Sequence, residues 1–417
     1  MNYDEKYADS LGVEHHREVI KRLQLAIAKA DLDALVVFRP DFFHWINTHQ
    51  SVFIDGGMLG MAMLIVPREG EPVGICSEHE YDAMLESAAI SDWRAVQFWT
   101  GQEDRYATQK TPAIRYASDQ RSTSPEGGIL PFVVSLKNTL EQEGLSGARL
   151  GVELNNLNLG LHELLVAELA GYELKDSLPL LTEARMLKTD YEVYNMRYAA
   201  HQQWLVCHDI MMNLRPGDTY ADLRHRIQVG AAQAHSVDGN RFLMIYMGDT
   251  PAATSRNFDR TIAMGDMLSI DLGFTVRGYV ADSGRAYVMG EPSELQQQIA
   301  DAYGEAHQVV KKAMVPGART GDIYDMAASM VREKGLTDFR RGHIGHGLGC
   351  CTFVEEFPFL MTGADTLLQP NMIMTLEIPF YGRGFGGYFE EDILLITEDG
   401  NESLTPAPFG LNVISGS

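Results

Sequence analysis

The chain has 417 residues, of which 45% are hydrophobic and 22% charged, a balance typical of globular proteins that excludes wholesale disorder. Its formal net charge of −23 disfavours nucleic acids and anionic membrane surfaces as partners, because like charges repel. The N-terminal segment lacks the apolar stretch of a signal peptide, and no apolar run is long enough to span a membrane. With only four cysteines, these features predict a cytoplasmic protein.

The first part of the chain alternates between helix and strand patterns, which predicts an α/β domain. Apolar residues recur at helical spacing over 15–30, and LDALVVFRP at 32–40 predicts a short strand. Residues 57–76 predict two strands joined by a Glu-Gly turn. The polar segment 100–128 is long for an internal loop, which indicates a functional or mobile loop.

The second part of the chain begins with a helix start signal. Thr189 and, three residues later, Glu192 form a capping-box pattern ahead of a long helical stretch. A second helix, strand pairs, two more helices (about 293–314 and 320–334) and further strand pairs follow. We therefore predict two domains, 1–184 and 185–417.

Four acidic residues lie in segments that otherwise have the pattern of buried strands. Asp271 and Asp282 flank a turn within 267–290, while Glu377 follows an apolar run and Glu391 opens the next long strand. One buried strand Asp is usually a hydrogen-bonded structural residue, but four matched acids need a cation or metal to offset burial. Four oxygen ligands and one imidazole would suit a pair of Mn, Fe or Co ions, with Zn possible.

The segment GHIGHGLGCC, residues 342–351, contains two histidines that could supply the imidazole. A cysteine-rich zinc site would need paired cysteine spacings, which this segment lacks. A phosphate-binding loop would need a Gly-Lys-Ser/Thr sequence, which is also missing. A histidine at one corner of the carboxylate site is the interpretation that remains.

Taken together, these residues resemble the pita-bread metallopeptidase family, which includes prolidase, aminopeptidase P and creatinase. The shared pattern comprises Asp271, Asp282, GHGLG with His346, TLE with Glu377, and EEDILLIT with Glu391. It covers about 185–417, and the preceding residues look like a creatinase-type N-terminal domain. The resemblance implies an α/β creatinase-like N-terminal domain followed by an α+β pita-bread catalytic domain.

The resemblance also implies two divalent metal ions, Mn before Co, Fe or Zn. Asp271 would hold one ion, Asp282 and Glu391 would bridge both, and His346 and Glu377 would complete the other. A bridging water would attack a polarised carbonyl, and Glu377 could shuttle its proton, so Glu377 and His346 are the catalytic candidates. Creatinase lacks much of this ligand set and works without metal, whereas this chain keeps all five residues.

Three positions depart from the family pattern. The peptidases have a histidine ahead of the first Asp ligand, where this chain has Thr254 and Ser255, and another after the metal-bound histidine, where it has Phe353 or Val354. Prolidases also have an arginine two residues before the last Glu, where this chain has Phe389. Because one such donor contributes about 2.7–4 kcal/mol to transition-state stabilisation, we expect a rebuilt substrate pocket.

The candidates for substrate contact are His343, Arg256, Phe353, Phe389 and Trp45. Trp45 lies in a segment from which creatinase-like relatives lend side chains to a neighbouring subunit, which implies a homodimer. The alternative for this segment is an aromatic cluster in the core.

The resemblance implies a hydrolase that cleaves an amide C–N bond in a dipeptide or small molecule, like an Xaa-Pro dipeptidase or aminopeptidase. One alternative is creatinase-like hydrolysis of a small amidine or amide metabolite. Another is a metal-dependent lyase of the dimethylsulfoniopropionate-lyase type, which would suit a metal site without the peptidase donors. A catalytically dead binding module is disfavoured, because it would be free to lose the ligands.

Overall fold

The computed structural model describes residues 3–98, 113–122, 128–250, 257–336, 338–350 and 354–416. The chain forms two compact units, Asp9–Arg185 and a second unit made of Met1–Ala8 with Met186–Ser417. The division falls beside the predicted boundary at 184/185. Residues 3–8 belong to the second unit, where the Tyr3 hydroxyl donates to Oδ1 of Asn195 at 2.5 Å.

The Asp9–Arg185 unit contains a seven-stranded sheet in the order β5-β4-β3-β2-β1-β6-β7. Its strands are β1 (Ala34–Val37), β2 (Met63–Pro67), β3 (Val73–Ser77), β4 (Asp92–Phe98), β5 (Tyr116–Ser122), β6 (Arg149–Val152) and β7 (Glu173–Asp176). Its helices are α1 (Glu5–Lys29, which starts in the other unit), α2 (Pro40–Asn47), α3 (Val52–Asp55), α4 (Tyr81–Ser87), α5 (Ile129–Gln142), α6 (Leu159–Glu168) and α7 (Leu178–Arg185). The predicted β2–β3 hairpin is confirmed as an antiparallel pair.

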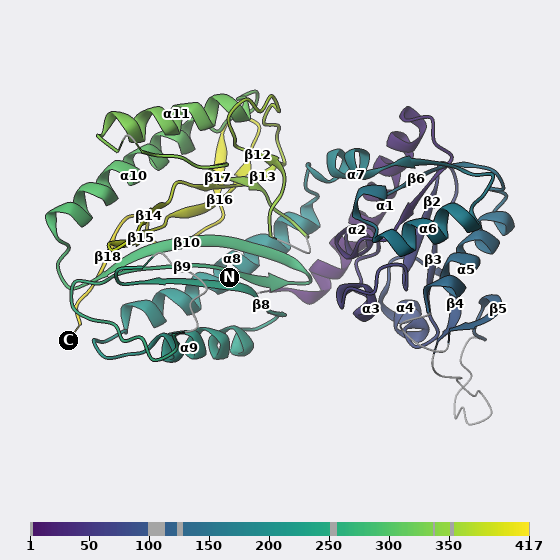
Figure 1. Ribbon diagram of the computed structural model, residues 1–417, viewed down its shortest axis with the longest axis horizontal. Coiled ribbons are helices and arrows are strands. Elements are labelled where there is room, and N and C mark those ends of the chain that lie inside the picture. The colour runs from purple at the N-terminus through teal and green to yellow at the C-terminus, as the bar shows by residue number, and fades with distance from the viewer. Residues whose placement is uncertain are drawn as a thin grey trace. The chain divides into compact units, whose positions relative to one another are not determined.

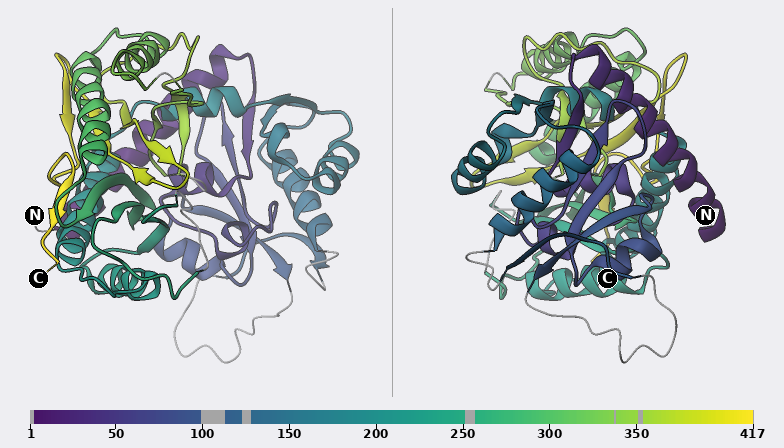
Figure 2. Two further views of the ribbon diagram at one scale, coloured as in Figure 1. Left: turned by 60° about the vertical axis from the view of Figure 1, so that its left-hand side comes forward. Right: turned by 90° about the vertical axis from the view of Figure 1, so that its right-hand side faces the viewer.

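Alternation along β1 explains why helices cover both faces of this sheet (Figure 2). Ala34 and Val36 pack in one apolar cluster with residues of α5 and α6, whereas Leu35 and Val37 pack in another with residues of α1 and α2. Successive side chains of a strand point to opposite faces, so a continuous apolar run fits a strand that is buried on both sides.

The predicted loop over 100–128 is wrong in part, because it contains the edge strand β5, which pairs in parallel with β4. The sequence of β5, YASDQRS, has no apolar alternation that would mark it as a strand. An edge strand of this kind is hard to recognise from its sequence, since one side has no neighbour to pack against. Residues 99–112 and 123–127 lie outside the described part of the chain.

The second unit is built on a nine-stranded sheet, with seven strands in the order β12-β11-β13-β16-β10-β9-β8, β17 beside β16 and β18 beside β10. Its strands are β8 (Gly239–Met247), β9 (Met267–Val276), β10 (Tyr279–Met289), β11 (His346–Gly347), β12 (Glu356–Phe359), β13 (Ile373–Glu377), β16 (Glu391–Ile396), β17 (Asn401–Ser403) and β18 (Asn412–Ile414). A separate hairpin pairs β14 (Phe380–Gly382) with β15 (Gly386–Tyr388).

Two helix pairs cover this sheet, each over a different half (Figure 1). Residues of α8 (Asp190–Met212) and α9 (Tyr220–Gln233) share an apolar core with β8, β9 and β10. Residues of α10 (Glu294–Ala313) and α11 (Thr320–Glu333) share another with β13 and β16. The predicted capping box is confirmed, because Thr189 and Glu192 bond reciprocally at the start of α8.

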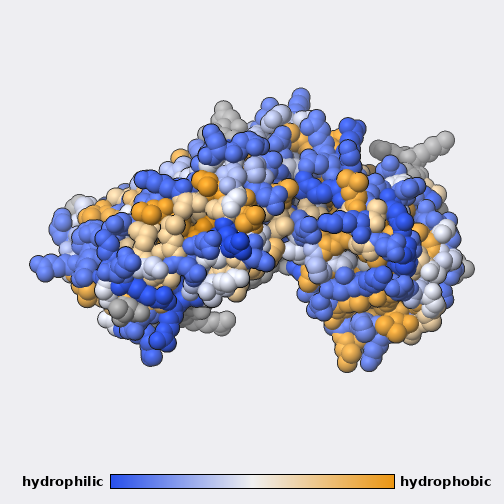
Figure 3. All heavy atoms as spheres, turned by 90° about the horizontal axis from the view of Figure 1, so that it is seen from above, coloured by the Kyte–Doolittle hydropathy of each residue, from blue (hydrophilic) through white to orange (hydrophobic). Residues whose placement is uncertain are grey.

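Hydrophilic residues dominate the face seen in Figure 3, and apolar residues form small separate groups on it. Among the described residues, none of the helices combines the length and apolar character needed to cross a bilayer. The cytoplasmic location stays a prediction.

Candidate metal centre

Five neighbouring strands of the nine-stranded sheet each carry one of the predicted ligand residues. In sheet order these are His346 on β11, Glu377 on β13, Glu391 on β16, Asp282 on β10 and Asp271 on β9. Glu377 lies directly opposite Glu391 in the ladder, and Gly284 lies opposite both Glu391 and Asp271. Backbone pairing therefore brings together donors that are far apart in the sequence.

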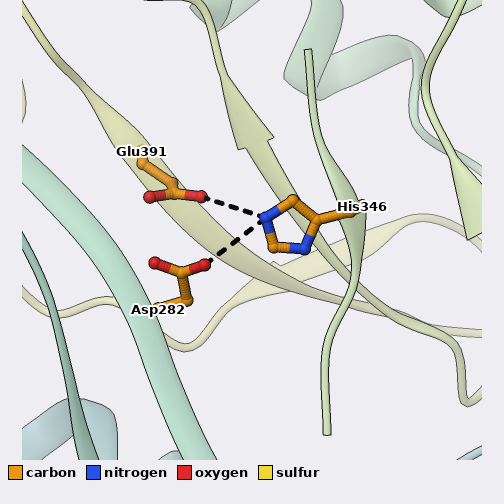
Figure 4. Close-up of side chains that lie close together, drawn as sticks. All are labelled: Asp282, His346 and Glu391. Atoms are coloured by element: carbon orange, nitrogen blue, oxygen red, sulfur yellow. Dashed lines mark ion pairs between the residues drawn. The ribbon is translucent and has the colours of Figure 1, made fainter. Parts of the chain in front are cut away.

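The first cluster in this array consists of Asp282, His346 and Glu391, which are all buried. Nε2 of His346 lies 3.4 Å from Oδ2 of Asp282 and 3.9 Å from Oε1 of Glu391 (Figure 4). One potential ligand atom from each residue lies within 4.8 Å of the others. This spacing suits three ligands that converge on one cation.

The orientation of His346 is set by its glycine neighbours. Nδ1 lies 2.9 Å from the Gly347 carbonyl oxygen, to which it donates, so that Nε2 faces the carboxylates. Gly345 has φ of 149°, and a Cβ there would overlap the Thr375 carbonyl oxygen. A Cβ on Gly347 would lie 2.6 Å from the Phe357 carbonyl oxygen. The glycines of GHGLG thus let β11 lie close to its neighbours.

Asp271 and Glu377 complete the array beside this cluster. Oε2 of Glu377 accepts a hydrogen bond from Nη2 of Arg341 at 2.7 Å, and Oε1 lies 3.4 Å from Nδ1 of His343. Oδ1 of Asp271 is buried and has no hydrogen-bond partner among the described residues. A buried carboxylate oxygen without a donor is unfavourable unless a cation binds it. The orphaned oxygen and the donor types therefore fit divalent metal ions.

The pKa values of the residues in this array also indicate a cation-binding site. Burial, followed by the charges of neighbouring carboxylates, raises the pKa of Asp271 and of Glu391 well above their usual range. Burial also raises the pKa of Glu377, although Arg341 opposes this effect. Burial disfavours the charged form of His346, but the hydrogen bond and charge of Asp282 outweigh it and raise its pKa to about 9. Without a cation the array retains protons, so metal binding is expected to release them.

The array lines one side of a cavity of about 290 Å³ within this unit. The remaining lining residues are Arg241, Phe242, Met244, Tyr246, Arg341, His343, Val354, Glu355, Tyr381 and Phe389. His343, Phe389 and Val354, which were singled out in the sequence, thus face the same space as the candidate ligands. Of the other predicted substrate residues, Trp45 is described by the structure and does not line this cavity.

Trp45 is fully buried in the apolar core of the first unit, where its ring lies edge-on to Phe42 at 6.4 Å between centroids. It has no exposed surface with which to reach a neighbouring subunit, so the aromatic-cluster alternative describes it correctly. Arg256 and Phe353 lie outside the described residues, as do Thr254 and Ser255.

Sequence reasoning missed Arg341, Tyr246 and Tyr381. The two tyrosine hydroxyls lie 3.2 Å apart, and the Cζ of Arg341 lies 5.6 Å from the Tyr381 ring centroid. Arg341 stands only two residues before His343 in RRGHIGH, which is the one signal that could have identified it. Tyr246 and Tyr381 come from separate hairpins, and no local pattern connects them.

A second charged cluster supports strand β16. Arg285 donates from Nη1 to the Glu391 carbonyl oxygen at 2.7 Å and from Nη2 to Oδ1 of Asp392 at 2.6 Å. Lys311 donates to the other oxygen of Asp392 at 2.5 Å. Adjacent residues of a strand point to opposite faces of the sheet. These contacts to Asp392 therefore lie on the face of β16 opposite the Glu391 carboxylate.

Comparisons with known proteins agree with this architecture. Residues 194–398 match the family described as metallopeptidase family M24, and residues 20–187 match the creatinase/prolidase N-terminal domain. The probable dipeptidase PepE of Mycobacterium tuberculosis is 27% identical over 357 residues, which cover 85% of this chain and 86% of that protein. The creatinase of a Bacillus species is 27% identical over 293 residues, 67% of this chain and 71% of that protein.

The solved Xaa-Pro dipeptidase from Bacillus anthracis superposes with a TM-score of 0.78 at 19% identity, covering 95% of this chain and 99% of that chain. The dipeptidase PepE from Mycobacterium ulcerans superposes with a TM-score of 0.75 at 23% identity, covering 97% and 99%. The predicted fold class, a creatinase-like domain followed by a pita-bread domain, is confirmed.

Proposed function

Because the chain belongs to metallopeptidase family M24 and is a peptidase-like hydrolase, we propose that it uses two divalent metal ions to cleave the amide C–N bond of an Xaa-Pro dipeptide or a similar small substrate. The observation that carries the proposal is the convergence of five metal-compatible donors, one from each of five adjacent strands, on one cavity. The dipeptidase names of several relatives support the substrate class.

Asp271, Asp282, His346, Glu377 and Glu391 would hold the ions. When bound, such ions supply an acidified water and polarise a substrate carbonyl. We assign proton transfer to Glu377, which takes a proton from the attacking water and delivers it to the leaving nitrogen. Arg341 holds one oxygen of Glu377 in place through its hydrogen bond, and Nδ1 of His343 lies 3.4 Å from the other oxygen.

The cavity wall supports a second candidate, creatinase-like hydrolysis of a small amidine or amide. Phe389 and Val354 are apolar lining residues at positions where family peptidases are expected to have polar donors. A volume of about 290 Å³ is also small for a long peptide. The lyase alternative shares these features but forms an alkene, whereas either hydrolysis forms an amine and an acid or urea. Product analysis therefore separates the three reactions.

The first test is the metal content of the purified protein by elemental analysis, with Mn, Co, Fe and Zn measured together. We expect about two ions per chain in the wild type and a clear loss in His346→Ala. His225→Ala is the matched control, because His225 is an exposed histidine on α9 that does not line the cavity. Full metal content in His346→Ala would contradict the assignment of this residue.

The second test is turnover of Xaa-Pro dipeptides by metal-loaded protein. We expect Asp282→Ala and Glu391→Ala to lose both metal and turnover. A wild-type protein that binds two ions but cleaves no amide would refute the hydrolase and shift the search to alkene products. Light scattering on the same samples tests the proposed homodimer.

A further inference from the structure

Arg341 places a positive charge in the cavity, and most of its donors have no role in the proposed chemistry. Its side chain is only 23% exposed and is held between Glu377 and the ring of Tyr381. Its Nε is buried and has no hydrogen-bond partner among the described residues. A guanidinium has five N–H donors in a rigid fork, so the one hydrogen bond that it makes within the described part of the chain, to Glu377, leaves donors for a ligand in the cavity.

Bound metal determines the charge of the cavity. Its lining carboxylates are Asp271, Asp282, Glu355, Glu377 and Glu391. With all five ionised, two divalent ions would offset four of their charges, which leaves one carboxylate opposite the guanidinium groups of Arg241 and Arg341. The loaded cavity therefore attracts an anion.

An apolar wall lies beside Arg341. Phe389 stacks on Tyr246 at 6.0 Å between ring centroids with an interplanar angle of 21°, and on Tyr381 at 6.5 Å and 25°. Phe389 occupies the position at which prolidases are expected to have an arginine, so a ring fills that place here. The guanidinium of Arg341 lies over Tyr381, the next ring along this wall. The wall and the guanidinium together suit a group with one apolar face and a negative charge at its edge.

We propose that Arg341 binds the free carboxylate of the substrate's leaving group, while Tyr246, Phe389 and Tyr381 pack against the apolar side of that group. The site then selects a dipeptide, or an acid of similar size, over the corresponding C-terminal amide. Arg241 also lines the cavity but is exposed, so solvent screens its charge and its contribution is smaller. The choice of a dipeptide as the substrate rests on the proposed hydrolase activity. The binding test below does not, because it measures the affinity for a carboxylate without turnover.

The binding test measures the affinity of L-proline and of L-prolinamide for manganese-loaded protein by calorimetry. We expect the wild type to prefer proline and Arg341→Gln to weaken proline binding by about 10- to 100-fold with little change for prolinamide, because a hydrogen-bonded charge pair is lost. Arg340→Gln is the matched control, since Arg340 is an exposed neighbour that does not line the cavity. Equal affinity of the wild type for both compounds would overturn the inference.

The kinetic test compares Ala-Pro with Ala-Pro amide. We expect Arg341→Gln to lower kcat by a similar factor on both substrates, because Arg341 also orients Glu377, and to raise KM for the acid alone. An equal loss of kcat on both substrates without this selective rise in KM would overturn the inference, because it would mean that Arg341 acts only through Glu377. Arg341→Lys keeps the positive charge but lacks the planar guanidinium, so it should retain part of the preference for Ala-Pro over its amide. This variant replaces Arg341→Gln in the test if the Gln variant does not fold.

The two proposals fail separately. If the wild type cleaves neither peptide but binds proline through Arg341, the dipeptidase activity is wrong and carboxylate recognition stands. If it cleaves both peptides equally well with or without Arg341, the hydrolase stands and the inference is wrong.

Discussion

The support of strand β16 by Asp392 leads to a prediction that can be worked out from the structure. The Asp392 carboxylate is shared by Arg285, whose side chain is 1% exposed, and Lys311, whose side chain is 22% exposed. Removing one partner of a buried ion pair typically costs about 3–5 kcal/mol, because the remaining charge is left without solvent or partner. Lys311 has some access to water and Arg285 has almost none. We therefore expect Asp392→Asn to lower the free energy of unfolding by about 3 kcal/mol.

The same substitution should weaken metal binding. Arg285 also donates to the carbonyl oxygens of Glu391 and Gly284, each at 2.7 Å. If Arg285 loses its ion pair with Asp392, it positions β16, and with it the candidate ligand Glu391, less firmly. Changes to groups that orient metal ligands typically reduce metal affinity by about 10- to 100-fold. Urea unfolding and manganese titration of Asp392→Asn measure the two effects. Glu398→Gln, an exposed change in the turn after β16, should leave both within experimental error.

The pH dependence gives this prediction a sharper test. Burial opposes ionisation of Asp392, but the charges of Arg285, His307 and Lys311 outweigh it and hold its pKa below its usual range. A carboxyl group with a lowered pKa stabilises the fold above its unfolded value, and this contribution is lost as the pH falls towards the folded value. The stability gap between wild type and Asp392→Asn should therefore shrink below pH 3.8. A gap under 1 kcal/mol at neutral pH, or one that does not shrink, would refute the reasoning.

Two further predictions concern other buried positions. Burial raises the pKa of Glu153 from 4.5 to about 7, so ionisation of this group should lower the free energy of unfolding by about 3 kcal/mol as the pH rises through this interval. In urea unfolding, Glu153→Gln should therefore lose about 3 kcal/mol less than the wild type over the same range, and a decline parallel to that of the wild type would contradict the assignment. A Cβ on Gly284 would overlap the Phe389 ring and lie 2.9 Å from the Ile270 carbonyl oxygen, so Gly284→Ala should destabilise by about 1–3 kcal/mol in thermal melts, whereas Gly342→Ala, which has open space, should be neutral.

The β9–β10 hairpin shows what a sequence can predict about this site. Turn residues Arg277 and Gly278, both with positive φ, separate strands whose acids stand 11 residues apart in the sequence. In the resulting register Asp271 faces Gly284 and Asp282 faces Gly273, so the two acids lie near each other across neighbouring strands. Local turn chemistry determines this pairing, and the sequence therefore predicts it well.

Positions that depend on distant pairing could not be predicted in this way. Tyr246 enters the cavity because β8 pairs with β9, and Tyr381 enters it from the β14–β15 hairpin, but neither strand carries a signal for where it lies. The hypothesis that Trp45 contacts the substrate does not agree with its buried position, for a different reason. Seven of the eight residues of α2 are buried, so helical periodicity does not distinguish a core aromatic residue from one at a binding surface.

The position of each group in the sheet also explains how the substrate wall can differ from the family pattern while the ligand set stays complete. The five candidate ligands lie on adjacent strands of one continuous ladder, where a change of register would displace several of them together. Arg341, Tyr246 and Tyr381 come instead from the segment before β11, from the edge strand β8 and from a separate hairpin. Such positions can change without disturbing the ladder. The ligand ladder therefore indicates the class of reaction, whereas the identity of the substrate must be inferred from the peripheral wall, where this chain has Phe389 and Arg341.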